Sequence, residues 1–285
     1  MLTTQLLEFW GVDEAALVDV ARRTVGPCDV YIGGSLADDV GTITSDVDLY
    51  CFVAGGEAPV APAPARVGAA GVECHVVRVA DYSDFPESLS VLLTDPDRAA
   101  LRTPYPSPAA LRCMHTLYRD RALAPGPLSD AVRRETAADL THLYVGLRSV
   151  ISCAASAEDV IAMLSMGEYW TALYGTRLVA EFALDAALAV GGHVNPNTKW
   201  RMSLAERAIV AGDLPYDMDG LVPGLFPSPL GDGDPFTAAV ALARGCLAYA
   251  ADGMVPAFPQ LATARALVES LAEWVDAGAP TFVRT

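Results

Sequence analysis

The stretch YIGGSLADDVGTITSDVDLYCFV, residues 31–53, decides the fold of this chain. An apolar strand ends in a glycine turn, and a short polar connection leads into a second strand. Residues two apart in a strand share a face, so Asp46 and Asp48 project together while the residues between them point into the core. We therefore predict strands over 28–32 and 46–53, with two carboxylates on one face of the second.

Paired carboxylates on one strand face predict a cation site. The two charges repel each other unless a divalent cation neutralises them, and hard oxygen ligands favour magnesium. Glu73 lies in a third predicted strand, VECHVVRV, and is placed to add a third carboxylate to the same ions. His75 shares the strand face of Glu73, and we expect it to be a neighbour of the site rather than a ligand, because oxygen ligands suit magnesium.

The glycine turn ahead of the carboxylates has the features of a phosphate-binding turn. Gly33 and Gly34 permit close backbone approach, and Ser35 supplies an N–H and a hydroxyl. A phosphate-binding turn beside metal-binding carboxylates indicates phosphoryl or nucleotidyl transfer. Taken one by one, the same residues are also compatible with a plain hairpin turn and a solvated strand face.

This arrangement carries a family resemblance. A small-small-Ser turn, a spacer and then Asp-hydrophobic-Asp-hydrophobic resembles the motif of the polymerase-β-like nucleotidyltransferase superfamily, matched by Gly-Ser at 34–35 and Asp-Val-Asp-Leu at 46–49. The motif-level match covers residues 28–78, and the rest of the plan looks like the aminoglycoside nucleotidyltransferases. The resemblance implies ATP or another NTP as co-substrate and two Mg²⁺ ions held by the paired aspartates and Glu73. It also implies transfer of a nucleoside monophosphate with release of pyrophosphate.

Helical periodicity replaces strand-like alternation beyond about residue 85, and this change predicts two domains. We expect an α/β protein, with a small mixed-sheet catalytic domain over 1–125 and an α-helical substrate-binding bundle over 126–285. The bundle is predicted to open with helices over 129–153 and 166–190. Further expected features are a helix after Asp13, Pro/Gly-rich loops at 55–71 and 223–235, and helices near 236–251 and 261–277.

The first bundle helix supplies candidates for the general base. Glu135, Asp139 and His142 fall on one side of it at i, i+4 and i+7. The resemblance implies a carboxylate base on this helix that takes the proton from the attacking hydroxyl, and Asp139 is our first choice. Ordinary solvated positions are the alternative for all three, and Glu168 and Glu181 come next if they are dispensable.

Two cations of the predicted bundle are candidates for phosphate binding. Arg148 lies further along the first bundle helix, and Lys199 is the single lysine of a chain with 19 basic residues. The resemblance implies a Lys or Arg from the helical domain that supports the phosphates. A surface arginine and a loop lysine packed over Trp200 are the corresponding alternatives.

Composition bounds the remaining possibilities. The chain has 285 residues, 52% hydrophobic and 19% charged, which excludes a disordered protein or a coiled coil. A net charge of −16 disfavours nucleic acid and favours a cationic small molecule. Six scattered cysteines without a CxxC pair indicate buried thiols rather than a zinc site or disulfides. We expect a cytoplasmic protein with no membrane span and no signal peptide.

The resulting prediction is a magnesium-dependent nucleotidyltransferase. Its acceptor would be the hydroxyl of a small, cationic molecule such as an aminoglycoside or a related natural product, in antibiotic modification or natural product biosynthesis. Three alternatives stay open: a protein-nucleotidylating enzyme, a synthase of nucleotide signals, and a catalytically inactive nucleotide-binding scaffold. A homodimer is also left open.

Overall fold

The computed structural model consists of two compact units, Met1–Thr141 and His142–Thr285. The first unit ends after Thr141 rather than after residue 125, because helix α7 (Pro127–Thr136) packs on strands of the first unit. The residues that the structure describes are 2–55, 63–82, 107–214, 216, 218–226, 235–253 and 259–276.

A mixed sheet forms the centre of the first unit, in the strand order β3-β4-β2-β1-β5. Strands β2 and β4 pair in parallel, whereas the other neighbouring strands pair antiparallel. The sheet confirms the expected α/β class with a small mixed sheet. The strands are β1 (Asp29–Ile32), β2 (Val47–Val53), β3 (Ala65–Val67), β4 (Ala70–Arg78) and β5 (Ala122–Ala124).

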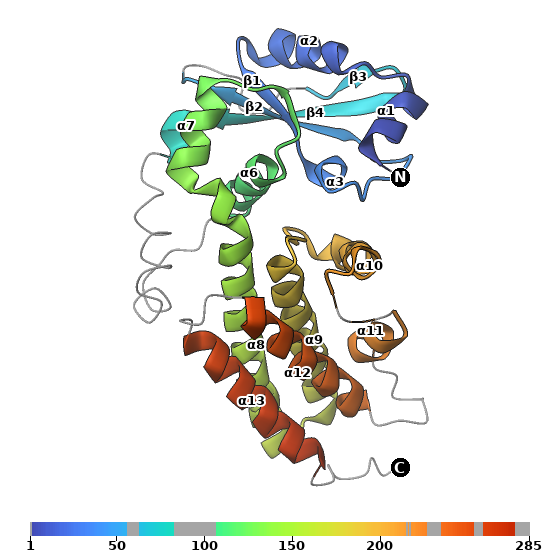
Figure 1. The fold of residues 1–285 in the computed structure, drawn as a ribbon, viewed down its shortest axis with the longest axis vertical. Coiled ribbons are helices and arrows are strands. Elements are labelled where there is room, and N and C mark those ends of the chain that lie inside the picture. Colours follow the sequence, from blue (N-terminus) through green and yellow to red (C-terminus); the bar gives the residue numbers. More distant parts are fainter. Residues whose placement is uncertain are drawn as a thin grey trace. The chain divides into compact units, whose positions relative to one another are not determined.

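Helices cover both faces of this sheet (Figure 1). One face packs against α1 (Thr3–Trp10) and α2 (Glu14–Val25). The other packs against α6 (Pro108–Arg119) and α7. Strand alternation assigns the faces, since Leu49 and Cys51 of β2 belong to the core under α1 and α2, whereas Tyr50 and Phe52 belong to the core under α6 and α7. Asp48 therefore faces the same side as α6.

Of two local predictions in the first unit, the structure confirms one and revises the other. The expected helix after Asp13 is α2, and the Asp13 side chain caps it by accepting a hydrogen bond from the Ala15 N–H at 3.0 Å. The expected loop at 55–71 instead holds the β3–β4 hairpin, although its residues 56–62 lie outside the described ranges. Gly68 makes the turn with φ +56°, where an added Cβ would lie 2.4 Å from the Trp10 carbonyl oxygen.

The predicted continuous helix over 129–153 is broken in the structure. Helix α7 ends at Thr136, Ala137 adopts a left-handed φ of +48°, and a 3₁₀ turn, η2 (Ala138–Leu140), precedes α8 (Thr141–Ser165). Ala138 of η2 packs into the core under the sheet, which turns the chain away from the axis of α7. Glu135, Asp139 and His142 consequently do not share one side of a single helix, and that expectation is wrong.

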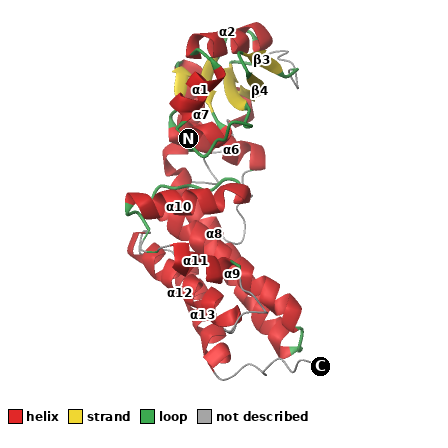
Figure 2. Ribbon diagram, turned by 90° about the vertical axis from the view of Figure 1, so that its right-hand side faces the viewer, coloured by secondary structure: helices red, strands yellow, loops and turns green. Residues whose placement is uncertain are grey.

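The second unit consists of helices and their connections, with no strand among its described residues (Figure 2). Helix α12 packs against α9, α11 and α13. The expected loop at 223–235 begins inside α11, and residues 227–234 lie outside the described part. Beyond α8 the elements are α9 (Tyr169–Val190), η3 (Thr198–Trp200), α10 (Arg201–Ala211), α11 (Met218–Leu225), α12 (Pro235–Gly253) and α13 (Pro259–Asp276).

Two further findings concern the chain as a whole. All six cysteines are free and buried, as expected from their spacing. Among the described helices, none combines the length and the apolar character that a membrane crossing requires.

Candidate functional site

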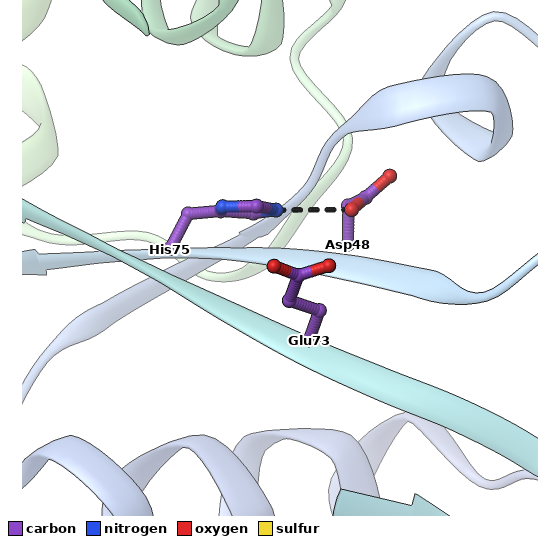
Figure 3. A group of neighbouring side chains, drawn as sticks. All are labelled: Asp48, Glu73 and His75. Atoms are coloured by element: carbon purple, nitrogen blue, oxygen red, sulfur yellow. Dashed lines mark hydrogen bonds and ion pairs between the residues drawn. The ribbon is translucent and has the colours of Figure 1, made fainter. Parts of the chain in front are cut away.

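Asp48, Glu73 and His75 form a cluster on the α6 side of the sheet (Figure 3). The parallel register places Asp48 of β2 opposite Glu73 of β4, and Tyr50 opposite His75. One oxygen or nitrogen atom from each of the three cluster residues lies within 4.8 Å of the others. The cluster is a carboxylate–carboxylate–imidazole donor set that could hold a divalent cation.

A hydrogen bond joins the imidazole to one carboxylate of the cluster. His75 Nε2 lies 2.9 Å from Asp48 Oδ1, and the two side chains are 33% and 22% exposed. This hydrogen bond raises the pKa of His75 above its ordinary value, against the opposing effect of burial. A proton on His75 and a cation bound by Asp48 would therefore compete for the same carboxylate.

Tyr50 supports the imidazole from the neighbouring strand. The two rings are tilted against each other with their centroids 4.9 Å apart. Burial, with the nearby Asp48 charge, raises the pKa of Tyr50 to about 12, so the phenol stays neutral at physiological pH. His75 is thus held between a carboxylate and an aromatic ring, and its position is set by β2.

The glycine turn packs directly against Asp48. The Gly33 N–H donates to the Asp48 carbonyl oxygen at 2.8 Å. Gly34 has φ +60°, and an added Cβ would lie 1.8 Å from Asp48 Oδ2. Ser35 is half-buried in α3 (Gly34–Ala37), the short helix that begins within the turn. The group that approaches Gly34 closely is therefore a side chain of the candidate site, and the expected approach of a phosphate stays a prediction.

Contacts of the buried Asp38 carboxylate anchor α3 to the rest of the first unit. Asp38, which ends α3, lies 3.2 Å from His115 Nε2 and 3.1 Å from Arg119 Nε through its Oδ1, and both partners belong to α6. The next residue, Asp39, accepts hydrogen bonds from Thr3 on α1. Sequence reasoning missed this anchor, although the Asp-Asp pair directly after the glycine turn was a visible signal.

The other expected cation ligand, Asp46, lies just before β2 and is exposed. A Cβ added to Gly71 of β4 would lie 3.9 Å from the Asp46 Cβ. Asp46 therefore lies next to β4, the strand that pairs with β2. The group of three consists of Asp48, Glu73 and His75 and does not include Asp46. His75 was expected to be only a neighbour, and the structure places its ring nitrogen among the donors.

Asp139, the first choice for the general base, lies in η2 at the end of the first unit. Its Oδ1 accepts a hydrogen bond from Arg133 Nη1 at 2.8 Å, and the side chain is 73% exposed. Glu135 is half-buried in the last turn of α7. Neither residue belongs to the cluster at Asp48, and the identity of the base stays a prediction.

The remaining candidates lie in the second unit. His142 is half-buried and Arg148 is exposed on α8, and the Lys199 ammonium lies 5.4 Å from the centre of the Trp200 ring. The proposed contact of Lys199 with phosphate remains a prediction, and its local geometry matches the alternative of a lysine packed over tryptophan. Glu168 is exposed ahead of α9.

Glu181 is committed to an ion-pair network within the second unit. Arg177 donates to its Oε1 at 2.8 Å, and Arg201 donates to its Oε2 at 2.7 Å. Arg201 also forms a two-point contact with the buried Asp185 carboxylate, at 2.9 and 2.8 Å. Both oxygens of the Glu181 carboxylate thus accept hydrogen bonds from guanidinium groups of the second unit, which indicates a structural role.

Comparison with known proteins adds no family assignment. No protein-family model matches the chain, and no curated protein matches it significantly. The resemblance to nucleotidyltransferases therefore depends on the motif within residues 28–78 and on the two-unit plan.

Proposed function

We propose that this protein is a divalent-cation-dependent nucleotidyltransferase that transfers a nucleoside monophosphate from an NTP, with ATP as the first candidate, to a hydroxyl of a small molecule. One observation carries the proposal: a cation-binding donor set and a glycine turn meet at Asp48. Phosphate and cation sites must adjoin in such an enzyme, because the cation would neutralise negative charge on the phosphates.

The donor set fits a divalent cation by its chemistry. Asp48 and Glu73 would supply carboxylate oxygens and His75 a ring nitrogen, while the role expected of Asp46, which precedes β2 and lies outside this set, stays a prediction. The cation, when bound, lowers the barrier by activating the acceptor hydroxyl and by neutralising charge on the leaving pyrophosphate. Magnesium matches the oxygens, whereas the imidazole is a ligand that manganese or zinc accepts more readily.

The chain's own groups then have separate tasks. The backbone N–H groups of Gly34 and Ser35 orient the triphosphate, since that of Gly33 is already bonded to the Asp48 carbonyl oxygen. The acceptor oxygen forms a bond to the α-phosphorus while the bond from that phosphorus to the β-phosphate oxygen breaks, and pyrophosphate leaves. The acceptor's proton passes to a carboxylate base, for which Asp139 remains the first candidate.

Position-specific labelling of ATP tests this function. The protein is incubated with Mg²⁺ or Mn²⁺, a metabolite extract, and ATP labelled at either the α- or the γ-phosphorus. We expect α-label on a new product and γ-label in pyrophosphate. Asp48→Asn should abolish the transfer, whereas Asp19→Asn, an equal charge change at an exposed position of α2, should not.

Other outcomes redirect the assignment. Transfer of γ-label to the product would make the enzyme a phosphotransferase. Label recovered on protein or in a dinucleotide would favour the protein-nucleotidylating or signal-synthesising alternatives. If no label moves with either cation, the proposal fails and the scaffold alternative replaces it.

A further inference from the structure

A pocket of about 270 Å³ adjoins the cluster within the first unit. It is lined mainly by β4 and α6, and Glu73 and His75 of the donor set are among its lining residues. At about 30 Å³ per water, its volume corresponds to roughly nine waters, enough for a small metabolite or one end of a larger molecule. The residues that line the pocket include Tyr50, Glu73, His75, Tyr82, Arg112 and Cys113.

Sheet order places this pocket and the glycine turn on opposite sides of Asp48. The turn follows β1, the pocket is lined by β4, and β2 with Asp48 runs between them. In-line displacement at phosphorus requires the attacking and leaving oxygens on opposite sides of the reacting atom. If the turn holds the triphosphate, the pocket is therefore where the acceptor hydroxyl approaches.

The wall contributed by α6 carries a positive charge. Arg112 is exposed to the pocket, and among the described residues its guanidinium forms no ion pair with a carboxylate. Arg112 lines the pocket together with Tyr50 and His75, and its positive charge opposes the rise in the pKa of both groups. The planar fork of arginine matches the two oxygens of a carboxylate or phosphate. The Glu73 carboxylate, which also lines the pocket, belongs to the cluster, where a bound cation would neutralise it.

We propose that this pocket binds the acceptor through an anionic oxygen group, a phosphate or carboxylate on a small hydroxyl-bearing molecule, with Arg112 as the residue that determines specificity. The role as acceptor site rests on the proposed nucleotidyl transfer, while the binding preference rests on the pocket alone. The inference differs from the cationic acceptor expected from the net charge of −16. Net charge is a property of the whole protein surface, whereas Arg112 sets the charge of the pocket wall that the acceptor contacts.

Calorimetric titration without nucleotide measures the preference directly. The intact protein is titrated in magnesium buffer with glycerol 3-phosphate, gluconate, glycerol and spermidine. We expect the two anions to bind at least tenfold more tightly than glycerol, and spermidine to show no binding that depends on Arg112. Arg112→Gln should weaken both anions by tenfold or more, and Arg112→Lys should restore part of the affinity.

A matched control removes general charge effects. Arg66→Gln makes the same change at an exposed position of β3 outside the pocket and should leave anion affinity unchanged. Circular dichroism and melting temperature establish that each variant folds. If glycerol 3-phosphate and gluconate both fail to bind the wild type, or bind Arg112→Gln equally well, the inference is wrong.

The labelling assay separates this inference from the proposed function. Transfer of α-label to spermidine or to an aminoglycoside, unaffected by Arg112→Gln, would overturn the anionic acceptor and leave the nucleotidyltransferase in place. Arg112-dependent anion binding without any transfer of label would refute the nucleotidyltransferase and leave the anion pocket in place.

Discussion

Replacement of Gly34 by alanine tests the contact between the glycine turn and the donor set. The residue has φ +60°, and its added Cβ would lie 1.8 Å from Asp48 Oδ2. Gly11 offers a matched control, since it has φ +65° and an added Cβ there meets no atom within 4 Å. The two substitutions share the backbone cost and differ in what the methyl group displaces.

The expected magnitudes follow from these two environments. An L-residue in the left-handed region costs about 1–2 kcal/mol, which is the whole effect expected for Gly11→Ala. Gly34→Ala must also push the Asp48 side chain from its rotamer, at about 0.5–1.5 kcal/mol, and weaken its partly exposed hydrogen bond to His75, at about 1 kcal/mol. Together these contributions should lower the free energy of unfolding by about 2.5–4.5 kcal/mol in Gly34→Ala.

Two measurements on both variants decide the matter. Urea unfolding gives the stability difference, and titration with Mn²⁺ gives cation affinity. Because the displaced oxygen belongs to the donor set, Gly34→Ala should lose at least tenfold in Mn²⁺ affinity while Gly11→Ala retains it. Equal destabilisation together with unchanged Mn²⁺ binding in Gly34→Ala would refute the proposed contact.

Four further outcomes are expected. Asp48→Asn should reduce pyrophosphate release below a tenth of wild type with little change in melting temperature, as checked by a coupled phosphate assay. Cation and NTP together should raise the melting temperature by more than the sum of their separate shifts, which a melting series over ATP, GTP, CTP and UTP measures. The pKa of His75 lies above its ordinary 6.5 in the folded protein. Without cation, the stability that His75 contributes should therefore be present below about pH 6.5 and lost as pH rises through the raised pKa. Urea unfolding should show that His75→Gln removes this dependence of the free energy of unfolding on pH. Asp139→Ala should lower kcat by roughly two to four orders of magnitude if this residue is the base, whereas a change under tenfold would assign it only the ion pair with Arg133.

Local patterns were sufficient to predict the part of the fold that carries the site. Alternation of apolar and polar residues placed the strands that the structure shows as β1, β2 and β4, and the Asp13 cap marked the start of α2. The same alternation predicted that Asp48 and Glu73 project from the strands instead of pointing into the core. These features depend on neighbours within a few residues, which a single sequence displays directly.

Features that depend on pairing between distant segments could not be predicted. The parallel register of β2 with β4 brings His75 to Asp48, and no local pattern specifies which strands pair or in which direction. The anchor from Asp38 to His115 joins residues far apart in the sequence. The break at Ala137 has the same origin, because α7 ends where its side chains must pack on the sheet, while helical periodicity alone continues past that point.

Asp48 links the two halves of the candidate site through separate parts of one residue. Its carbonyl oxygen accepts the Gly33 N–H, and its carboxylate lies against Gly34 on one side and bonds His75 on the other. The antiparallel pairing of Ile32 with Leu49 fixes the end of β1 beside this residue, so the turn cannot shift along β2 without breaking the ladder. A phosphate held by the turn and a cation held by the carboxylate would therefore keep a fixed separation. This rigidity is what in-line transfer requires, because small errors in the placement of reacting atoms cost large factors in rate.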